Sequence, residues 1–240
     1  MIGRILWIAV LVGVGVVTAL VQYDRQAEKS RAIASSVPEV VRSVAQRPVA
    51  AFALDGDNPE FALAEAERLV RRRPMPALHL RILAQAQFAA GRQDASGQTI
   101  QYAARRGWRE PLAQEAVLRL AIEAGDMPEA ARRYAALALR RDTEDALLEE
   151  LGPAIFSEPS GEGLRTLSEI VGGGKWWHGQ FLRRASRVMP PASVEEIVRS
   201  TTAAGTRYDC ELLEQLSRAL IQRDETVGMS FNVMVEENCP

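Results

Sequence analysis

The longest apolar stretch of this 240-residue chain lies at its start. Residues 5–21 read ILWIAVLVGVGVVTALV and carry no charge, with Arg4 immediately before them. A membrane-spanning helix needs roughly 20 apolar residues, with roughly 17 as the lower limit. Trp7 and Tyr23 lie near the two ends, where amphipathic rings favour the membrane interface. The pattern predicts a transmembrane anchor over residues 1–22 that contacts the lipid bilayer through residues 5–21.

A cleaved signal peptide is the competing interpretation of the same segment. Residues 17–19 (Val-Thr-Ala) offer a small-residue cleavage site after a short apolar run. The apolar run continues past that site through Leu20 and Val21, so the anchor is preferred.

The charges that flank the segment do not settle its orientation. A count of positive residues would keep the body in the cytoplasm, because Arg25, Lys29 and Arg31 follow the segment and only Arg4 precedes it. A short basic head before an apolar run is also how export signals begin. We expect a single-pass protein of a bacterial inner membrane with its body on the periplasmic side.

Beyond the anchor the pattern is helical almost throughout. Ala, Leu, Arg, Glu and Gln dominate, and all favour helices. Alternating apolar and polar runs and Asn-Gly hairpin signals are not evident, so few strands are expected. The sequence predicts an all-α fold: a stalk over residues 23–42, helical repeats over 43–151 and a divergent helical region over 152–240.

Several helix boundaries carry local signals. Asn58-Pro59 and Asp126-Met127-Pro128 each place an N-cap residue before a proline in the first turn. Ser193 and Glu196 have the spacing of a capping box. Gly152-Pro153 is expected to break the pattern, and the last fifteen residues to be irregular. Helix ends are predicted at three glycines, Gly91, Gly107 and Gly125.

A repeat of 34 residues separates Gly91 from Gly125, and the segments 77–110 and 111–144 align on it. Helix–turn–helix units of this length are typical of tetratricopeptide repeats. The chain resembles that family, although Gln114 stands where the first-helix tryptophan is usual and the closing proline occurs only at Pro74. The matching positions are Leu80, Leu83, Gly91, Gly125, Ser96, Ala130, Ile100, Tyr134, Ala103 and Leu137.

The resemblance implies a partner protein bound in a concave groove lined by the first helices of the repeats. The matching positions form a mixed set of charges and one amide, so no particular peptide class is indicated. They are Arg47, Arg81, Gln85, Glu115 and Arg119.

Two further features are candidates for partner binding. Arg72, Arg106 and Arg140 follow the 34-residue period and would form a basic edge, either for an acidic partner or simply as favourable charge at helix C-termini. Trp176, Trp177 and Phe181 form the densest aromatic cluster. The cluster is interpreted as core packing, as a binding hot spot, or as a membrane-surface contact helped by basic neighbours (Lys175, Arg183 and Arg184).

The two cysteines, Cys210 and Cys239, belong to no CxxC pair, so a zinc site is not suggested. In an exported domain they could form one disulfide; two unrelated free thiols are the alternative.

Catalytic chemistry is not evident. His79 and His178 are about 100 residues apart and lack a zinc-binding context. Residues 172–175 (Gly-Gly-Gly-Lys) do not complete a phosphate-binding loop. The net charge of −2 and the pI of about 5.9 argue against nucleic-acid binding. We expect no enzyme activity, no cofactor and no metal site.

The leading hypothesis is a membrane-anchored protein-interaction scaffold, with bacterial envelope or surface-polysaccharide assembly as a setting suggested by analogy. The alternative is an accessory subunit of an integral membrane complex, which makes its main contacts through the Gly13-Val14-Gly15 face of the single span. An enzyme with an unrecognised site is the third possibility.

Overall fold

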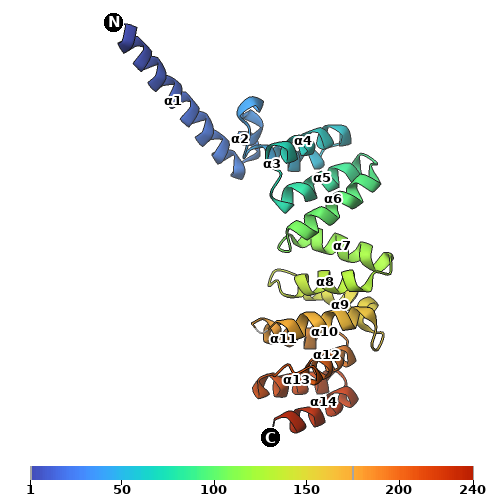
Figure 1. Ribbon diagram of the computed structural model, residues 1–240. Coiled ribbons are helices and arrows are strands. Elements are labelled where there is room, and N and C mark those ends of the chain that lie inside the picture. Colours follow the sequence, from blue (N-terminus) through green and yellow to red (C-terminus); the bar gives the residue numbers. More distant parts are fainter. Residues whose placement is uncertain (1, 175, 240) are drawn as a thin grey trace. The chain divides into compact units, whose positions relative to one another are not determined.

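The computed structural model describes residues 2–174 and 176–239, and within them the chain is all-helical without strands (Figure 1). The described residues form fourteen α-helices and two short 3₁₀ turns. The chain divides into two compact units, Met1–Glu110 and Pro111–Pro240. The division falls between the two segments that align on the 34-residue period.

The first unit contains the apolar helix and two helical hairpins. Helix α3 pairs with α4, α5 pairs with α6, and α4 also packs on α5. The hairpin core is formed by aliphatic side chains such as Leu63, Leu69 and Ile82. The elements are α1 (Ile2–Gln26), η1 (Ala27–Lys29), α2 (Arg31–Ser36), η2 (Glu39–Val41), α3 (Gln46–Leu54), α4 (Pro59–Arg72), α5 (Ala77–Ala89) and α6 (Gln93–Arg106).

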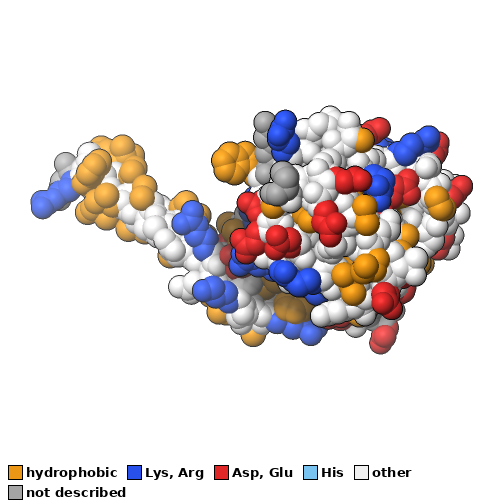
Figure 2. Space-filling model, turned by 90° about the horizontal axis from the view of Figure 1, so that it is seen from below, with side chains coloured by type: hydrophobic (Ala, Val, Ile, Leu, Met, Phe, Trp, Pro, Cys, Tyr) orange, Lys and Arg blue, Asp and Glu red, His pale blue; other side chains and the backbone are white. Residues whose placement is uncertain are grey.

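Helix α1 is long and apolar enough to cross a membrane. The mean hydropathy over an 18-residue segment of this helix is 2.4, and no part of that segment is buried inside the protein. Hydrophobic side chains therefore gather along it with no protein cover (Figure 2). The helix runs past the predicted end of the anchor and stops at Gln26.

The second unit is a double row of helices. The even-numbered helices α8, α10, α12 and α14 neighbour one another in one row, and α9, α11 and α13 do so in the other. A continuous core runs between the rows and contains its largest side chains, Tyr134, Phe156, Phe181 and Phe231. The helices are α7 (Pro111–Glu123), α8 (Met127–Ala138), α9 (Asp145–Phe156), α10 (Glu162–Gly173), α11 (His178–Val188), α12 (Pro191–Ala203), α13 (Cys210–Arg223) and α14 (Glu225–Asn238).

Local signals set many helix ends as predicted. The side chain of Asn58 accepts a hydrogen bond from the backbone N–H of Phe61 at 3.0 Å, and Asp126 caps α8 in the same way. Gly91 and Gly125 end α5 and α7 with the same positive φ of 73°. At both glycines the following N–H turns back to a carbonyl five residues earlier, a helix end that favours glycine.

Three expected boundaries are wrong. Ser193 is not an N-cap: α12 already begins at Pro191, and the Ser193 hydroxyl donates to the carbonyl of Phe156 at 2.8 Å. Residues 152–153 lie inside α9, where Gly152 leaves room for the ring of Tyr134. The last residues form α14 because they supply an apolar face that covers α13.

Glycines at helix crossings allow backbones to approach closely. A Cβ atom on Gly228 of α14 would lie 2.4 Å from the backbone nitrogen of Ile221 in α13. A Cβ atom on Gly163 of α10 would similarly lie 2.6 Å from the carbonyl oxygen of Ile155 in α9. Both hairpins therefore depend on the absence of a side chain at one point.

We predict that Gly228→Ala destabilises the second unit by about 1–3 kcal/mol, because the methyl group must displace a helix backbone. Gly173→Ala is the matched control: it lies at the end of α10 with nothing within 4 Å of its Cβ position, so its stability should be unchanged or slightly higher. Denaturant unfolding of the full chain in mild detergent, followed by circular dichroism, measures both. Equal stability of the two variants would show that the α13–α14 crossing tolerates a side chain.

Candidate functional site at the membrane junction

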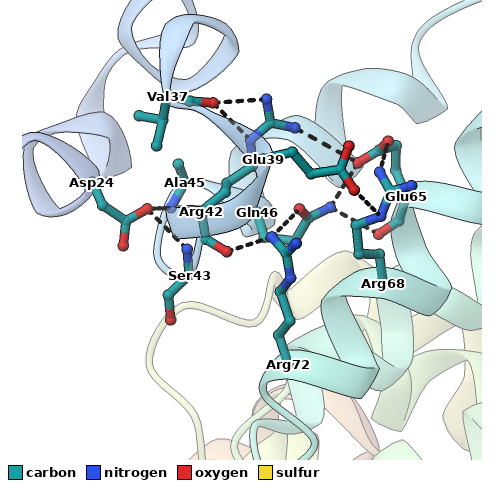
Figure 3. Close-up of polar contacts among 10 residues, drawn as sticks. All are labelled: Asp24, Val37, Glu39, Arg42, Ser43, Ala45, Gln46, Glu65, Arg68 and Arg72. Atoms are coloured by element: carbon teal, nitrogen blue, oxygen red, sulfur yellow. Dashed lines mark hydrogen bonds and ion pairs between the residues drawn. The ribbon is translucent and has the colours of Figure 1, made fainter. Parts of the chain in front are cut away.

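The last turn of the apolar helix ends in a buried carboxylate. Asp24 of α1 is only 4% exposed. It accepts hydrogen bonds from three consecutive backbone N–H groups just before α3. Those of Ser43 and Ala45, both at 3.0 Å, are drawn in Figure 3, and that of Val44 lies at 2.8 Å. Hydrogen bonds to an ionised carboxylate are stronger than neutral ones, and negative charge is favourable near a helix N-terminus. The Asp24 side chain thus joins the apolar helix α1 to the segment that leads into the first hairpin.

A small apolar cluster surrounds this contact. Ala27, Ala34, Val37 and Ala45 are fully or almost fully buried and come from η1, α2 and the segments that flank η2. Two polar contacts close its edges. The hydroxyls of Tyr23 and Ser36 lie 2.6 Å apart, and Arg47 forms an ion pair with Glu28 at 3.0 Å. Residues 23–47 therefore form a packed junction.

A second buried carboxylate, Glu65 of α4, holds the junction from the other side (Figure 3). The side-chain amide of Gln46 donates to its Oε2 at 2.7 Å and to its backbone carbonyl at 3.1 Å. Arg68 donates to Oε1 at 2.5 Å, and Arg42 lies 3.9 Å from Oε2. Arg68 also pairs with Glu39 at 3.2 Å. The Glu65 carboxylate is thus paired and hydrogen-bonded, as a buried charge requires.

Two arginines fix the backbone between α2 and α3. The guanidinium of Arg42 donates twice to the carbonyl of Val37, at 3.3 Å and 3.0 Å. Arg72, at the end of α4, donates to the carbonyl of Arg42 and to the side-chain oxygen of Gln46. This segment has little regular structure, yet side chains from α1, α3 and α4 hold it in place. These contacts fix the path of the backbone between α2 and α3.

The predicted groove residues mostly pair within their own repeats. In the first unit, Arg81 donates to Gln85 at 2.7 Å and pairs with Glu110 at 2.9 Å. Arg81 and Gln85 line a hollow of about 530 Å³ beside α3. In the second unit, Arg119 pairs with Glu150 at 2.9 Å and with Glu115 at 3.0 Å, and these contacts raise its pKa. Their role in partner binding stays a prediction.

The predicted basic edge makes structural contacts. Besides the contact of Arg72 with Arg42, the guanidinium of Arg106 donates to the carbonyl of Pro74 at 2.6 Å. Arg140 forms an ion pair with Asp142 at 2.5 Å. The first two arginines thus satisfy carbonyls that lie 30 and 32 residues earlier in the chain.

Two arginines that sequence reasoning did not assign to this role make the same kind of contact. Arg223 at the end of α13 donates to the carbonyls of Ser186 and Met189, at 2.8 Å and 2.7 Å. Arg184 of α11 donates to the carbonyl of Ala138, the last residue of α8, and to the carbonyls of Arg140 and Thr143 in the loop that follows. Unsatisfied carbonyls at helix C-termini favour such cationic donors. No sequence signal marks these contacts, because the partners are 34 to 46 residues apart.

The aromatic cluster divides between core and surface. Phe181 is fully buried, and the ring of Trp177 packs edge-on against it at 5.9 Å. Trp176 is 99% exposed. Lys175, one of the basic neighbours in the predicted membrane-surface contact, lies outside the described residues. Arg184, counted in the same hypothesis, is engaged with backbone carbonyls.

The two cysteines are joined. Cys210 and Cys239 form a disulfide that ties the first residue of α13 to the residue after α14. This closes the final hairpin covalently.

Both histidines contact other side chains or backbone of the fold. His79 is 2% exposed, and its Nδ1 lies 2.8 Å from the carbonyl of Arg73. Burial lowers the pKa of His79, which favours the neutral ring. His178 packs against the ring of Tyr208 at 5.1 Å. Across residues 2–174 and 176–239, no group of three or more His, Cys, Asp or Glu side chains could hold a metal ion.

Comparisons of the chain with protein-family models, with curated proteins and with solved structures give no match.

We predict that Asp24→Ala leaves three N–H groups at the junction without their acceptor and lowers the free energy of unfolding by about 2–3 kcal/mol. Amide hydrogen exchange at Ser43, Val44 and Ala45 should become faster while exchange in the second unit is unchanged. The control is Arg25→Ala, an exposed neighbour on the same helix. Unchanged protection of these amides in Asp24→Ala would rule out the carboxylate as their anchor.

We predict a pH dependence for the first unit from His79. Burial lowers the pKa of His79 in the folded state below the 6.5 of the unfolded chain. As the pH falls through 6.5, His79 therefore takes up a proton more readily in the unfolded chain, and the free energy of unfolding decreases. The free energy of unfolding should therefore be lower at pH 5.5 than at pH 7.5, and His79→Gln should show a smaller difference. The opposite slope, with stability gained on acidification, would contradict a neutral buried His79.

Proposed function

We propose that the chain is a single-span membrane protein whose helical-repeat body binds a partner protein and is held at the bilayer in a fixed orientation. The observation that carries the proposal is the contact of Asp24 with three N–H groups at the start of the first hairpin. A simple tether needs no such contact. A buried carboxylate at this point restricts how the first hairpin can move relative to α1.

The helical hairpins support a binding role. They pack in adjacent pairs, and Gly91 and Gly125 end equivalent helices of two aligned repeats with one backbone conformation. These features favour the tetratricopeptide-like interpretation of the repeats. Arrays of this kind present extended surfaces to partners.

The disulfide favours the exported side of the membrane. Disulfides persist in the bacterial periplasm and are rare in the cytosol, and Cys210–Cys239 closes the outermost hairpin of the second unit. We therefore propose a periplasmic body, with envelope or surface-polysaccharide assembly as its setting, which rests on analogy.

The rival proposal is an accessory subunit whose span makes the main contacts. Gly13 and Gly15 of α1 have nothing within 4 Å of their Cβ positions, so a neighbouring helix has access to them. This observation fits a helix–helix contact in the membrane, and it is equally expected of any single span surrounded by lipid.

Deleting residues 1–22 separates the two proposals, because it removes the span and leaves Asp24 in place. We predict that residues 23–240, exported by a cleavable signal, cross-link in cells to the same partner protein as the full chain. Identification of the cross-linked bands by mass spectrometry provides the measurement. A partner that cross-links to the full chain and is absent with residues 23–240 would instead support the accessory-subunit role.

We predict that the cysteines are oxidised in cells. After rapid acid quenching, a maleimide reagent should modify the full chain only when a reductant is added first, and Cys210→Ser should expose one reactive thiol at Cys239. Modification of the unaltered chain without reductant would place the body in a reducing compartment.

A further inference from the structure

The second unit contains a hollow of about 800 Å³ with a strongly basic lining. It lies between the end of α8, the loop after it, the start of α9 and one face of α11. Five arginines and two acidic residues line it. The arginines are Arg140, Arg141, Arg183, Arg184 and Arg187, and the acids are Glu144 and Asp145.

Part of this charge is already used by the fold. Arg184 is 12% exposed at its side chain, donates to the carbonyls of Ala138, Arg140 and Thr143, and pairs with Asp145 at 2.7 Å. Arg140 pairs with Asp142. These contacts fix the α8–α9 loop against α11. The loop therefore forms a defined wall of the hollow.

The remaining arginines are accessible and only weakly paired. Arg183 and Arg187 lie one helical turn apart on α11, and both are exposed. Arg183 donates through Nε to Gln215 at 3.0 Å, and Arg187 lies 3.8 Å from Asp145. Arg141 is exposed in the loop, and among the described residues neither Arg141 nor Arg183 has an ion-pair partner. The guanidinium groups of Arg141, Arg183 and Arg187 thus outnumber the two acids of the lining. One of these acids, Asp145, already pairs with Arg184.

We propose that this hollow, the α8–α11 basic pocket, binds an acidic segment of the partner protein. Guanidinium groups bind carboxylates through paired N–H donors, and a cluster of like charges gains most from a ligand of opposite sign. The volume accommodates several side chains, which exceeds the need of one small anion. The near-neutral, slightly acidic chain as a whole disfavours a nucleic acid. The inference rests on the proposed scaffold function and names the partner's chemistry.

The test uses the full chain in a neutral detergent and a fluorescein-labelled hexaglutamate peptide, with fluorescence anisotropy as the readout. We expect binding that weakens with added salt and falls by about tenfold or more in the double variant Arg183→Ala/Arg187→Ala. The matched control is Arg218→Ala on α13, which removes an arginine that is 66% exposed and pairs only loosely with Glu214 at 3.8 Å. It should bind the peptide as the unaltered chain does.

Four results would overturn the pocket: no binding of hexaglutamate at low salt, equal binding of a hexaglutamine peptide, equal loss in Arg218→Ala, or full competition by inorganic phosphate at the peptide's own concentration. If circular dichroism shows that the double variant is unfolded, Arg141→Ala in the loop takes its place with the same expected direction. Failure here is distinguishable from failure of the scaffold function. A partner cross-linked equally by the unaltered chain and the arginine variants would eliminate only the pocket.

Discussion

The carboxylate of Asp24 is the point at which an apolar helix becomes part of a folded body. A transmembrane helix satisfies its own backbone, so it has no intrinsic need to contact the rest of the chain. Here its last turn supplies an acceptor for the N–H groups that precede α3. The junction around Ala34 and the network around Glu65 build on that contact. The position of the first hairpin relative to α1 therefore depends on the Asp24 contact together with the apolar cluster and the polar contacts at its edges.

The helical units depend on two further devices. Glycines such as Gly163 and Gly228 let neighbouring helices approach to backbone contact, and alanines fill much of the remaining interface. Arginines such as Arg106 and Arg223 satisfy carbonyls near the ends of earlier helices. The glycines bring consecutive helices together, α9 with α10 and α13 with α14, and the arginines tie helices to earlier parts of the chain. Contacts between neighbouring elements are how a repeat array gains its stability. Two members of the arginine period visible in the sequence, Arg72 and Arg106, have this structural role.

The parts of the fold predictable from sequence are those set by neighbours along the chain. Asn58 and Asp126 start helices and Gly91 ends one through contacts with residues at most five positions away. The capping-box prediction at Ser193 failed because Pro191 starts the helix earlier and a carbonyl from α9 takes the hydroxyl. Gly152 was predicted to break a helix, whereas it lies inside α9 and leaves room for the ring of Tyr134. The sequence gives no sign of this contact because Tyr134 lies in an earlier helix.

The junction itself could not be predicted for the same reason. Asp24 reads as an ordinary polar residue after an apolar run, and its partners lie 19 to 21 residues later. Glu65 likewise resembles any helical surface acid until Gln46 and Arg68 surround it. The predicted anchor and the all-helical body were legible, while the contact that joins them required the structure.

The most direct test of a rigid junction is a distance measurement between the anchor and the first hairpin. Spin labels at Gln22→Cys and Arg71→Cys, on exposed positions of α1 and α4, can be measured by pulsed electron resonance in lipid nanodiscs, since the native cysteines are joined to each other. The account predicts one narrow distance distribution that broadens when Asp24→Ala is added. A broad distribution in the chain with Asp24 intact would show that the anchor is only a tether.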